Sequence, residues 1–133
     1  MSKRLTKEGI RASSGILNPV GHVILAFKDD AVAAQAAAAL REAGFAAEDI
    51  LLYTASEATP RLRERVKTAS EAAGFGYEIT LMRRYVALAE EGCGWIFVYA
   101  PSDETTQKVA EIAVRLGAKC AVRYHALANE DLI

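Results

Sequence analysis

The sequence contains few of the residues that mark a special class of protein. Its 133 residues include two cysteines, three prolines and one tryptophan, and aromatic residues make up 8%. Two cysteines cannot build the disulfide framework of a small secreted domain, so we expect reduced thiols and a cytoplasmic protein. No apolar run reaches the length of about 18 residues that a membrane-spanning helix needs, so no membrane contact is expected.

The sequence also lacks a large excess of either charge, because its net charge is −1. This balance disfavours nucleic acid and anionic membranes as partners. The exception is the N-terminus, where four basic residues (Lys3, Arg4, Lys7 and Arg11) face one acidic residue, Glu8. No apolar stretch follows this basic start, so it is not a secretory signal. We predict a basic N-terminal arm over residues 1–21 and a single α/β domain over residues 22–133.

The apolar residues, 52% of the chain, suffice for one core and fall into short segments. Strands are predicted over residues 22–27, 49–54, 95–100 and 119–127. The last strand is the most polar and is therefore expected at a sheet edge. Helices are predicted over 30–43, 59–73, 78–91 and 103–116, with Thr59-Pro60 starting the second and Gly74 ending it.

The order of these segments predicts a duplicated fold. Residues 23–45 and 96–118 align without a gap, and Asp30 falls on Asp103 and Gly44 on Gly117. Two strand–helix–strand units joined by a two-helix connector predict a four-stranded sheet of the ferredoxin-like kind, an α+β sandwich. If the connector is one bent crossover, the alternative is a three-layer, all-parallel Rossmann-like sheet. The first three strands are apolar on both faces, so connector helices or a partner subunit should cover the second face.

Two segments resemble a known family. HVILAFKDDAVAAQAAAALREAGFAAEDILLYT resembles the opening of the general stress protein (heat-induced stress protein) domain of small bacterial proteins. YVALAEEGCGWIFVYAPSDETTQKVAEIAVRLGA fits the same pattern, in which a tyrosine-bearing helix runs into a glycine turn and an apolar strand. The resemblance implies a stress-related bacterial protein, and it brings no catalytic residues to transfer.

Two sets of residues are candidates for binding. Small or acidic residues stand at the strand-to-helix corners, where they either cap helices or line a small-ligand site. The aromatic residues of the third strand alternate, so they share one face of the sheet. They either pack in the core, form a subunit interface or provide a surface that binds a small ligand or RNA. The ligand candidates are Lys28, Asp30, Tyr53, Tyr99, Ser102, Asp103 and His125, and the interface candidates are Trp95, Phe97, Tyr99 and Arg123.

Two further sets of residues are weaker candidates for a binding or metal site. A basic run in the connector (Arg61, Arg63, Arg65 and Lys67, with Arg83 and Arg84 further on) is either a salt-bridged surface or a phosphate-binding face. His22, Cys93, Cys120 and His125 show no metal-ligand spacing, yet His22, Cys93 and His125 converge at one sheet edge if the fold is duplicated. Independent packing of these side chains is the simpler interpretation, and no metal or cofactor is expected.

Three functions follow from these patterns. The leading hypothesis is a non-enzymatic domain that self-associates, first as a dimer, since two-fold dimers are the commonest oligomers. The second is a small-molecule sensor that binds near Lys28 and Ser102. The third is a small enzyme that uses His125 with a nearby acid or thiol.

Overall fold

The structure is a computed structural model that describes residues 4–12, 19–71, 76–125 and 129–133. The elements are α1 (Lys7–Ala12), β1 (His22–Phe27), α2 (Asp30–Glu42), η1 (Ala47–Asp49), β2 (Ile50–Tyr53), α3 (Ala55–Glu71), α4 (Gly76–Glu90), β3 (Gly94–Tyr99), α5 (Asp103–Arg115), β4 (Cys120–Tyr124) and β5 (Asn129–Asp131). None of the helices in these ranges has both the length and the apolar character needed to cross a membrane.

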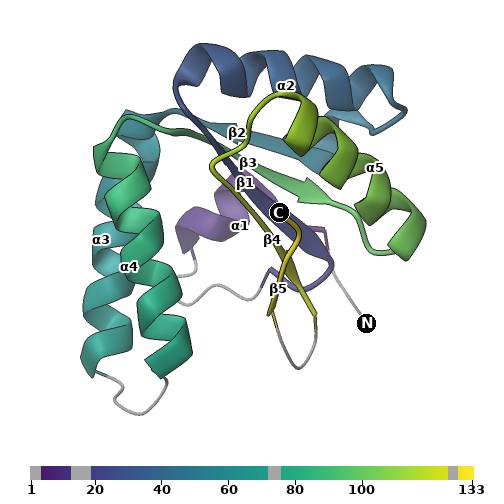
Figure 1. The fold of residues 1–133 in the computed structure, drawn as a ribbon. Coiled ribbons are helices and arrows are strands. Elements are labelled where there is room, and N and C mark those ends of the chain that lie inside the picture. The colour runs from purple at the N-terminus through teal and green to yellow at the C-terminus, as the bar shows by residue number, and fades with distance from the viewer. Residues whose placement is uncertain (1–3, 13–18, 72–75, 126–128) are drawn as a thin grey trace.

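The strands form one five-stranded antiparallel sheet in the order β2-β3-β1-β4-β5 (Figure 1). The all-parallel Rossmann-like alternative is therefore wrong. Helices α3 and α4 pack along each other, so the connector reverses the chain and β3 runs antiparallel to β2. The sheet also has one strand more than the predicted four, because β5 pairs outside β4.

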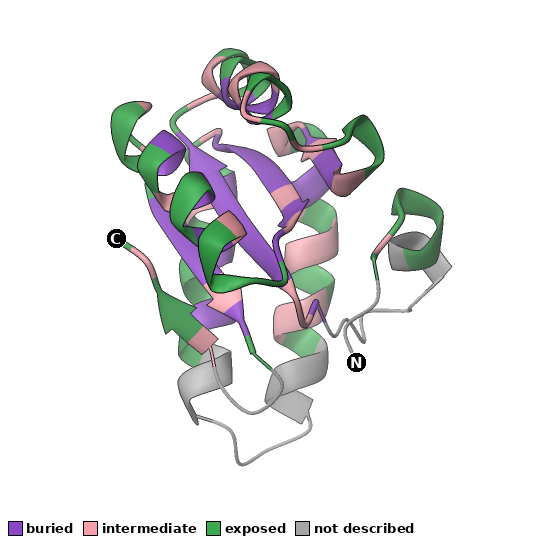
Figure 2. Cartoon of the chain, turned by 90° about the vertical axis from the view of Figure 1, so that its right-hand side faces the viewer, coloured by how far each residue is buried: buried purple, intermediate pink, exposed green. Residues whose placement is uncertain are grey.

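Helices cover both faces of the sheet, as its apolar strands predicted. Helices α2 and α5 lie on one face and α3 and α4 on the other (Figure 1). The first core contains Val23, Leu25, Phe27, Leu40, Ile96 and Val98, and the second contains Trp95, Tyr85, Met82, Leu81 and Val122. Figure 2 shows the buried strands between these layers and β5 exposed beside them.

Helix α2 shows how local sequence sets the geometry. Asp29 caps it, since its Oδ1 accepts a hydrogen bond from the Val32 N–H at 2.9 Å. Its buried face consists of alanines and Leu40, and this small surface lets the helix approach β3 closely. At Gly94 the approach is so close that a Cβ would stand 2.7 Å from the Cβ of Ala33. A glycine is therefore required at the start of β3.

The largest difference from the predicted boundaries is at the start of α3. Helix α3 begins at Ala55 rather than Thr59, with Pro60 inside it. Its start is capped by Thr54, whose Oγ1 accepts from the Glu57 N–H at 3.2 Å while Glu57 accepts from the Thr54 N–H at 3.0 Å. The predicted Gly74 break and the end of the predicted last strand at residues 126–127 lie outside the described residues.

The predicted last strand, β4, does not lie at the edge of the sheet. Strand β4 ends at Tyr124, and β5 takes the edge position beside it. Two features allow this pairing: the Leu132 N–H donates to the Ala121 carbonyl at 2.8 Å, and Leu132 packs against the first core.

Candidate functional site

The predicted corner residues lie at two opposite ends of the sheet. Strands β1 and β2 run in the same direction and terminate at one end of the sheet. Strands β3 and β4 run the other way and terminate at the opposite end. Lys28, Asp30 and Tyr53 therefore stand at one end, and Tyr99, Ser102, Asp103 and His125 at the other. A single site near Lys28 and Ser102, as the sequence suggested, is contradicted by this geometry.

The first end is a set of helix caps. Oδ1 of Asp30 accepts a hydrogen bond from the Ala55 N–H at 2.9 Å and so ties the start of α2 to the start of α3. Asp29 and Thr54 satisfy the first amides of the two helices. The pKa of Glu57 is lowered, because its carboxylate accepts the Thr54 backbone N–H. These helix starts already hold acidic groups, so an anionic ligand has no place there.

The second end combines a cap with an ion pair. Ser102 and Thr105 form a capping box at the start of α5, in which the Thr105 N–H donates to Ser102 Oγ at 3.1 Å. Asp103, the next residue, accepts a hydrogen bond from Nη1 of Arg123 on β4 at 2.8 Å. The Arg123 side chain is only 15% exposed, whereas that of Asp103 is 95% exposed. The guanidinium is thus held in a shielded position at the mouth of a groove.

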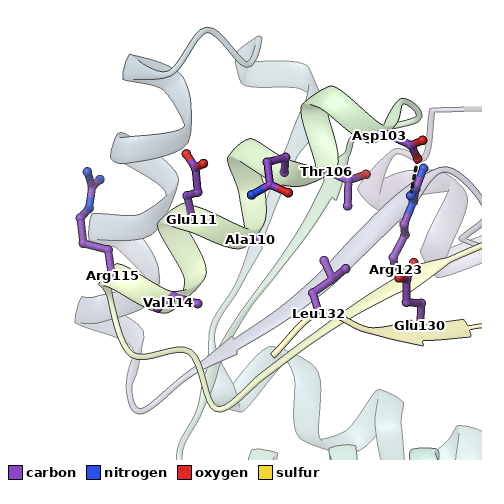
Figure 3. Close-up of a pocket in the computed structure, with 10 residues that line it drawn as sticks. Asp103, Thr106, Ala110, Glu111, Val114, Arg115, Arg123, Glu130 and Leu132 are labelled. Atoms are coloured by element: carbon purple, nitrogen blue, oxygen red, sulfur yellow. Dashed lines mark hydrogen bonds and ion pairs between the residues drawn. The ribbon is translucent and has the colours of Figure 1, made fainter.

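The groove lies between α5 and the β4–β5 pair and encloses about 650 Å³ (Figure 3). Along α5 it is lined by Asp103, Thr106, Gln107, Ala110, Glu111, Val114 and Arg115, and along the sheet by Arg123, Glu130 and Leu132. Arg123 and Glu130 are directly opposed in the β4–β5 register. The lining therefore mixes three acidic and two basic side chains with an apolar surface.

Val114 is the unusual residue of this groove. It is 66% exposed, although most large apolar side chains of the described chain are buried. The core-facing stripe of α5 contains the buried Val109, Ile112 and Ala113. Val114 lies outside that stripe, and this apolar residue on a polar face was the signal in the sequence that our interpretation missed.

His125 lies next to the groove and has an acidic partner, as the enzyme hypothesis required. Its Nε2 is 2.9 Å from Oε1 of Glu130, and both side chains are about half exposed. The thiols are elsewhere: Cys120 is at the opposite end of β4, and Cys93 precedes the start of β3, also at that end. A His125–thiol pair is therefore contradicted.

The predicted convergence of His22, Cys93 and His125 is wrong for the same reason. His22 opposes Tyr99 at one end of β3, while Cys93 lies beyond Gly94 at the other end. Within the ranges described, no three His, Cys, Asp or Glu residues gather in a way that would hold a metal ion. Burial raises the pKa of the Cys93 thiol and raises that of Cys120 to about 12, so both thiols stay protonated.

In the aromatic stripe of β3, Trp95 is buried in the core, while Phe97 and Tyr99 are partly exposed. Trp95 is 2% exposed and packs edge-on against Tyr85, with ring centroids 5.4 Å apart, so it is excluded from a subunit interface. Phe97 meets the Tyr53 ring at 5.7 Å and Tyr99 meets the His22 ring at 5.0 Å. Arg123, predicted to share an interface with these aromatic residues, belongs to the opposite face of the sheet, where it lines the groove.

Residues 4–7 of the N-terminal arm lie over the half-buried end of this stripe. Arg4 forms an ion pair with Asp49, and its guanidinium lies 5.8 Å from the centre of the Tyr99 ring. Nζ of Lys7 lies 4.7 Å from the centre of the Tyr53 ring. The predicted arm thus contacts the sheet through residues 4–7, while residues 1–3 and 13–18 lie outside the described chain.

Two of the six basic residues predicted in the connector pair with acidic neighbours. Arg63 of α3 donates to Glu90 of α4 at 3.0 Å, and Arg84 lies 3.5 Å from Asp131 of β5. Arg63, Arg83 and Arg84 are exposed. These contacts favour the salt-bridged surface over a phosphate-binding face.

Comparisons with protein-family models, with curated proteins and with solved structures return no match for this chain.

Proposed function

We propose that this chain is a non-enzymatic domain that works by self-association through α5 and the β5 edge. One observation carries the proposal: the exposed apolar side chain of Val114 lines the same mixed-charge groove as Glu130 of the edge strand β5. Edge strands and exposed apolar residues are the features that folded chains usually cover.

The charges along α5 fit a two-fold contact. Glu111 and Arg115 are one turn apart, with Val114 between them and the small Ala110 beside them. When two copies of α5 pack antiparallel, Glu111 of each copy meets Arg115 of the other, and the two Val114 side chains become buried. A two-fold interface repeats each such pair, so one favourable contact counts twice.

Native mass spectrometry with light scattering across the micromolar range tests this proposal. We expect a dimer for the parent chain and a monomer for Val114→Asp. Glu111→Arg or Arg115→Glu alone should weaken the dimer, and the two together should restore it. Ala34→Asp, at an exposed position of α2, is the matched control and should stay dimeric. A monomeric parent chain, or a double variant weaker than either single one, overturns the proposal.

The second candidate is a small-molecule sensor that binds in the same groove. Its support is the shielded guanidinium of Arg123 in a groove whose volume is in the range of about 300–1,000 Å³ usual for ligand sites. Because three carboxylates share that groove, a ligand carrying both an anionic and a cationic group fits best. A retained mass on the native protein that Arg123→Met removes would favour this function over self-association alone.

The enzyme hypothesis has less support. The His125–Glu130 pair is about half exposed, and both thiols lie at the other end of the sheet. His125→Ala should leave dimerisation and the fold unchanged. Loss of a cellular phenotype in a folded, dimeric His125→Ala protein would favour the enzyme instead.

The fold proposal is a ferredoxin-like duplication extended by β5. Strand β3 lies between β1 and β2, and β1 lies between β3 and β4, so each strand–helix–strand unit flanks a strand of the other. The aligned Gly44 and Gly117 both have positive φ, 107° and 70°, just after α2 and α5. An experimental structure with a different strand order would exclude the duplication.

The stress-related, cytoplasmic bacterial role remains part of the same proposal. Its support is the resemblance in the two quoted segments and the pair of buried free thiols. Cell fractionation and protein abundance after heat shock test it. A protein confined to an oxidising compartment would contradict it.

A further inference from the structure

The face of the sheet beneath residues 4–7 carries a second candidate binding surface, which we call the arm site and which runs along β2 from one end to the other. It consists of His22, Asp49, Tyr53 and Tyr99, all contacted by residues 4–7. Three of these residues belong to strands β1, β2 and β3, and Asp49 directly precedes β2. The site is therefore fixed by the sheet and not by the arm that covers it.

The contacts of the arm site are of kinds that any basic peptide could make, through its cationic side chains and its backbone. Asp49 pairs with a guanidinium, and the Tyr99 and Tyr53 rings each lie under a cation. Nε2 of the buried His22 accepts a backbone N–H, that of Leu5, at 3.1 Å. The side chain of Leu5 packs against the second core. None of these contacts depends on the peptide being part of the same chain.

The spacing of the contacts selects a pattern. Asp49 and Tyr53 stand at the two ends of β2, and they hold Arg4 and Lys7 respectively. Two cations three residues apart, with an apolar residue between them, match this separation. The site therefore fits an Arg-apolar-x-Lys segment rather than any cationic surface.

The bound arm is a weak occupant. The Arg4 side chain is 48% exposed, Lys7 is exposed, and α1 has only six residues. Exposed ion pairs and cation–π contacts contribute little once solvent and side-chain entropy are counted. A preformed site with a weakly held intramolecular occupant is open to competition.

We propose that the arm site is a recognition surface for a basic peptide segment of a partner protein, and that residues 4–7 occupy it as an intramolecular competitor. The proposal is independent of the α5 interface, which lies on the other face of the sheet. Val114→Asp should therefore leave peptide binding unchanged.

Fluorescence anisotropy with a labelled synthetic peptide of residues 1–8 tests the proposal on the full-length chain. Arg4→Glu/Lys7→Glu should release the arm and bind the peptide about tenfold more tightly than the parent chain, because an occupied site weakens apparent affinity by the fraction that is open. Adding Asp49→Asn or Tyr99→Ala to that variant should remove the gain. A peptide with glutamate at both cationic positions is the control and should not bind.

Two outcomes overturn the proposal. The first is a folded arm variant that binds the peptide no more tightly than the parent chain. The second is loss of the folded circular dichroism signal both in the charge-reversed variant and in Arg4→Gln/Lys7→Gln, since the arm would then be part of the core.

Discussion

The backbone N–H of Leu5 donates a hydrogen bond to Nε2 of His22, while Nδ1 of the same ring lies 3.2 Å from the carbonyl oxygen of Val20. A carbonyl oxygen only accepts, so Nδ1 carries the proton and Nε2 is the bare acceptor. The ring is therefore neutral in the docked state. A second proton on Nε2 would remove the acceptor that holds Leu5.

Stability should therefore fall with acid in a way that depends on His22. Burial lowers the pKa of His22 from its ordinary value of 6.5 in the folded chain, and this effect exceeds the opposing influence of the Val20 and Pro19 backbone and of nearby Asp49. Below pH 6.5 the unfolded chain binds a proton that the folded chain does not, so the free energy of unfolding decreases as pH falls towards the folded pKa. One such proton gives a slope of at most about 1.4 kcal/mol per pH unit.

Urea unfolding on both sides of pH 6.5 measures this slope. His22→Gln keeps an acceptor but cannot titrate, so it should show a shallower pH dependence than the parent chain. The carboxylates of the chain contribute equally to the pH dependence of the parent chain and of the variant. Identical slopes would contradict the assignment of His22 as a neutral, buried acceptor.

Gly94→Ala should destabilise the fold by about 1–3 kcal/mol, because overpacking a close contact forces its neighbours to move. The added Cβ would also stand 3.0 Å from the Asp29 carbonyl oxygen. Ala33→Gly in the same protein should recover part of the loss by removing the 2.7 Å contact. Denaturant midpoints measure both effects.

A matched control for Gly94 is Gly44→Ala. Nothing lies within 4 Å of a Cβ at Gly44, whose φ is +107°. Its cost should come from backbone strain, about 1–2 kcal/mol, and Ala33→Gly should not relieve it. Equal rescue of both variants would show that crowding is not the cause at Gly94.

The two tyrosine hydroxyls of the second core should be coupled. Tyr85 Oη and Tyr124 Oη are 2.8 Å apart, and burial raises the pKa of Tyr85. Tyr124→Phe leaves a buried Tyr85 hydroxyl without this partner and should cost about 1–3 kcal/mol. Tyr85→Phe/Tyr124→Phe should cost less than the sum of the single variants, and simple additivity in the double-mutant cycle would contradict the coupling.

The thiols should be unreactive in the folded chain. Cys93 and Cys120 are 1% and 0% exposed, and with a pKa of about 12 only about 10⁻⁵ of Cys120 is thiolate at pH 7. Ellman's reagent should therefore label them only as fast as the structure opens, and addition of denaturant should accelerate both. Cys120→Ala assigns the two rates. Immediate labelling in native buffer would contradict the burial.

The elements of this fold follow from local sequence, because strands such as 22–27 are apolar runs and α2 is an alanine-rich segment between a capping aspartate and Gly44. Strand direction does not follow from local sequence, since it depends on whether α3 and α4 reverse on each other, and that is a matter of tertiary packing. Strand β5 was missed because Asn-Glu-Asp has no apolar pattern. Its place comes from pairing with β4 and from the anchoring Leu132.

The candidate sites were harder to predict than the fold. Asp103 and Arg123 were each identified, but their contact joins a helix start to a strand 20 residues later. Lys28 and Ser102 share the same local context and yet lie at opposite ends of the sheet, because direction along the sheet cannot be read from a corner motif. Arg4 and Asp49 belong to segments whose contact no local pattern encodes.

The strand order has a consequence for how the chain is made. Strand β1 has β3 and β4 as its neighbours, and β2 has β3. A nascent chain that has emerged only as far as α4 therefore holds two apolar strands with no hydrogen-bonding partner in this sheet. Its first unit cannot form native strand pairs on the ribosome ahead of the rest, and that pairing begins only when β3, which starts at Gly94, leaves the exit tunnel.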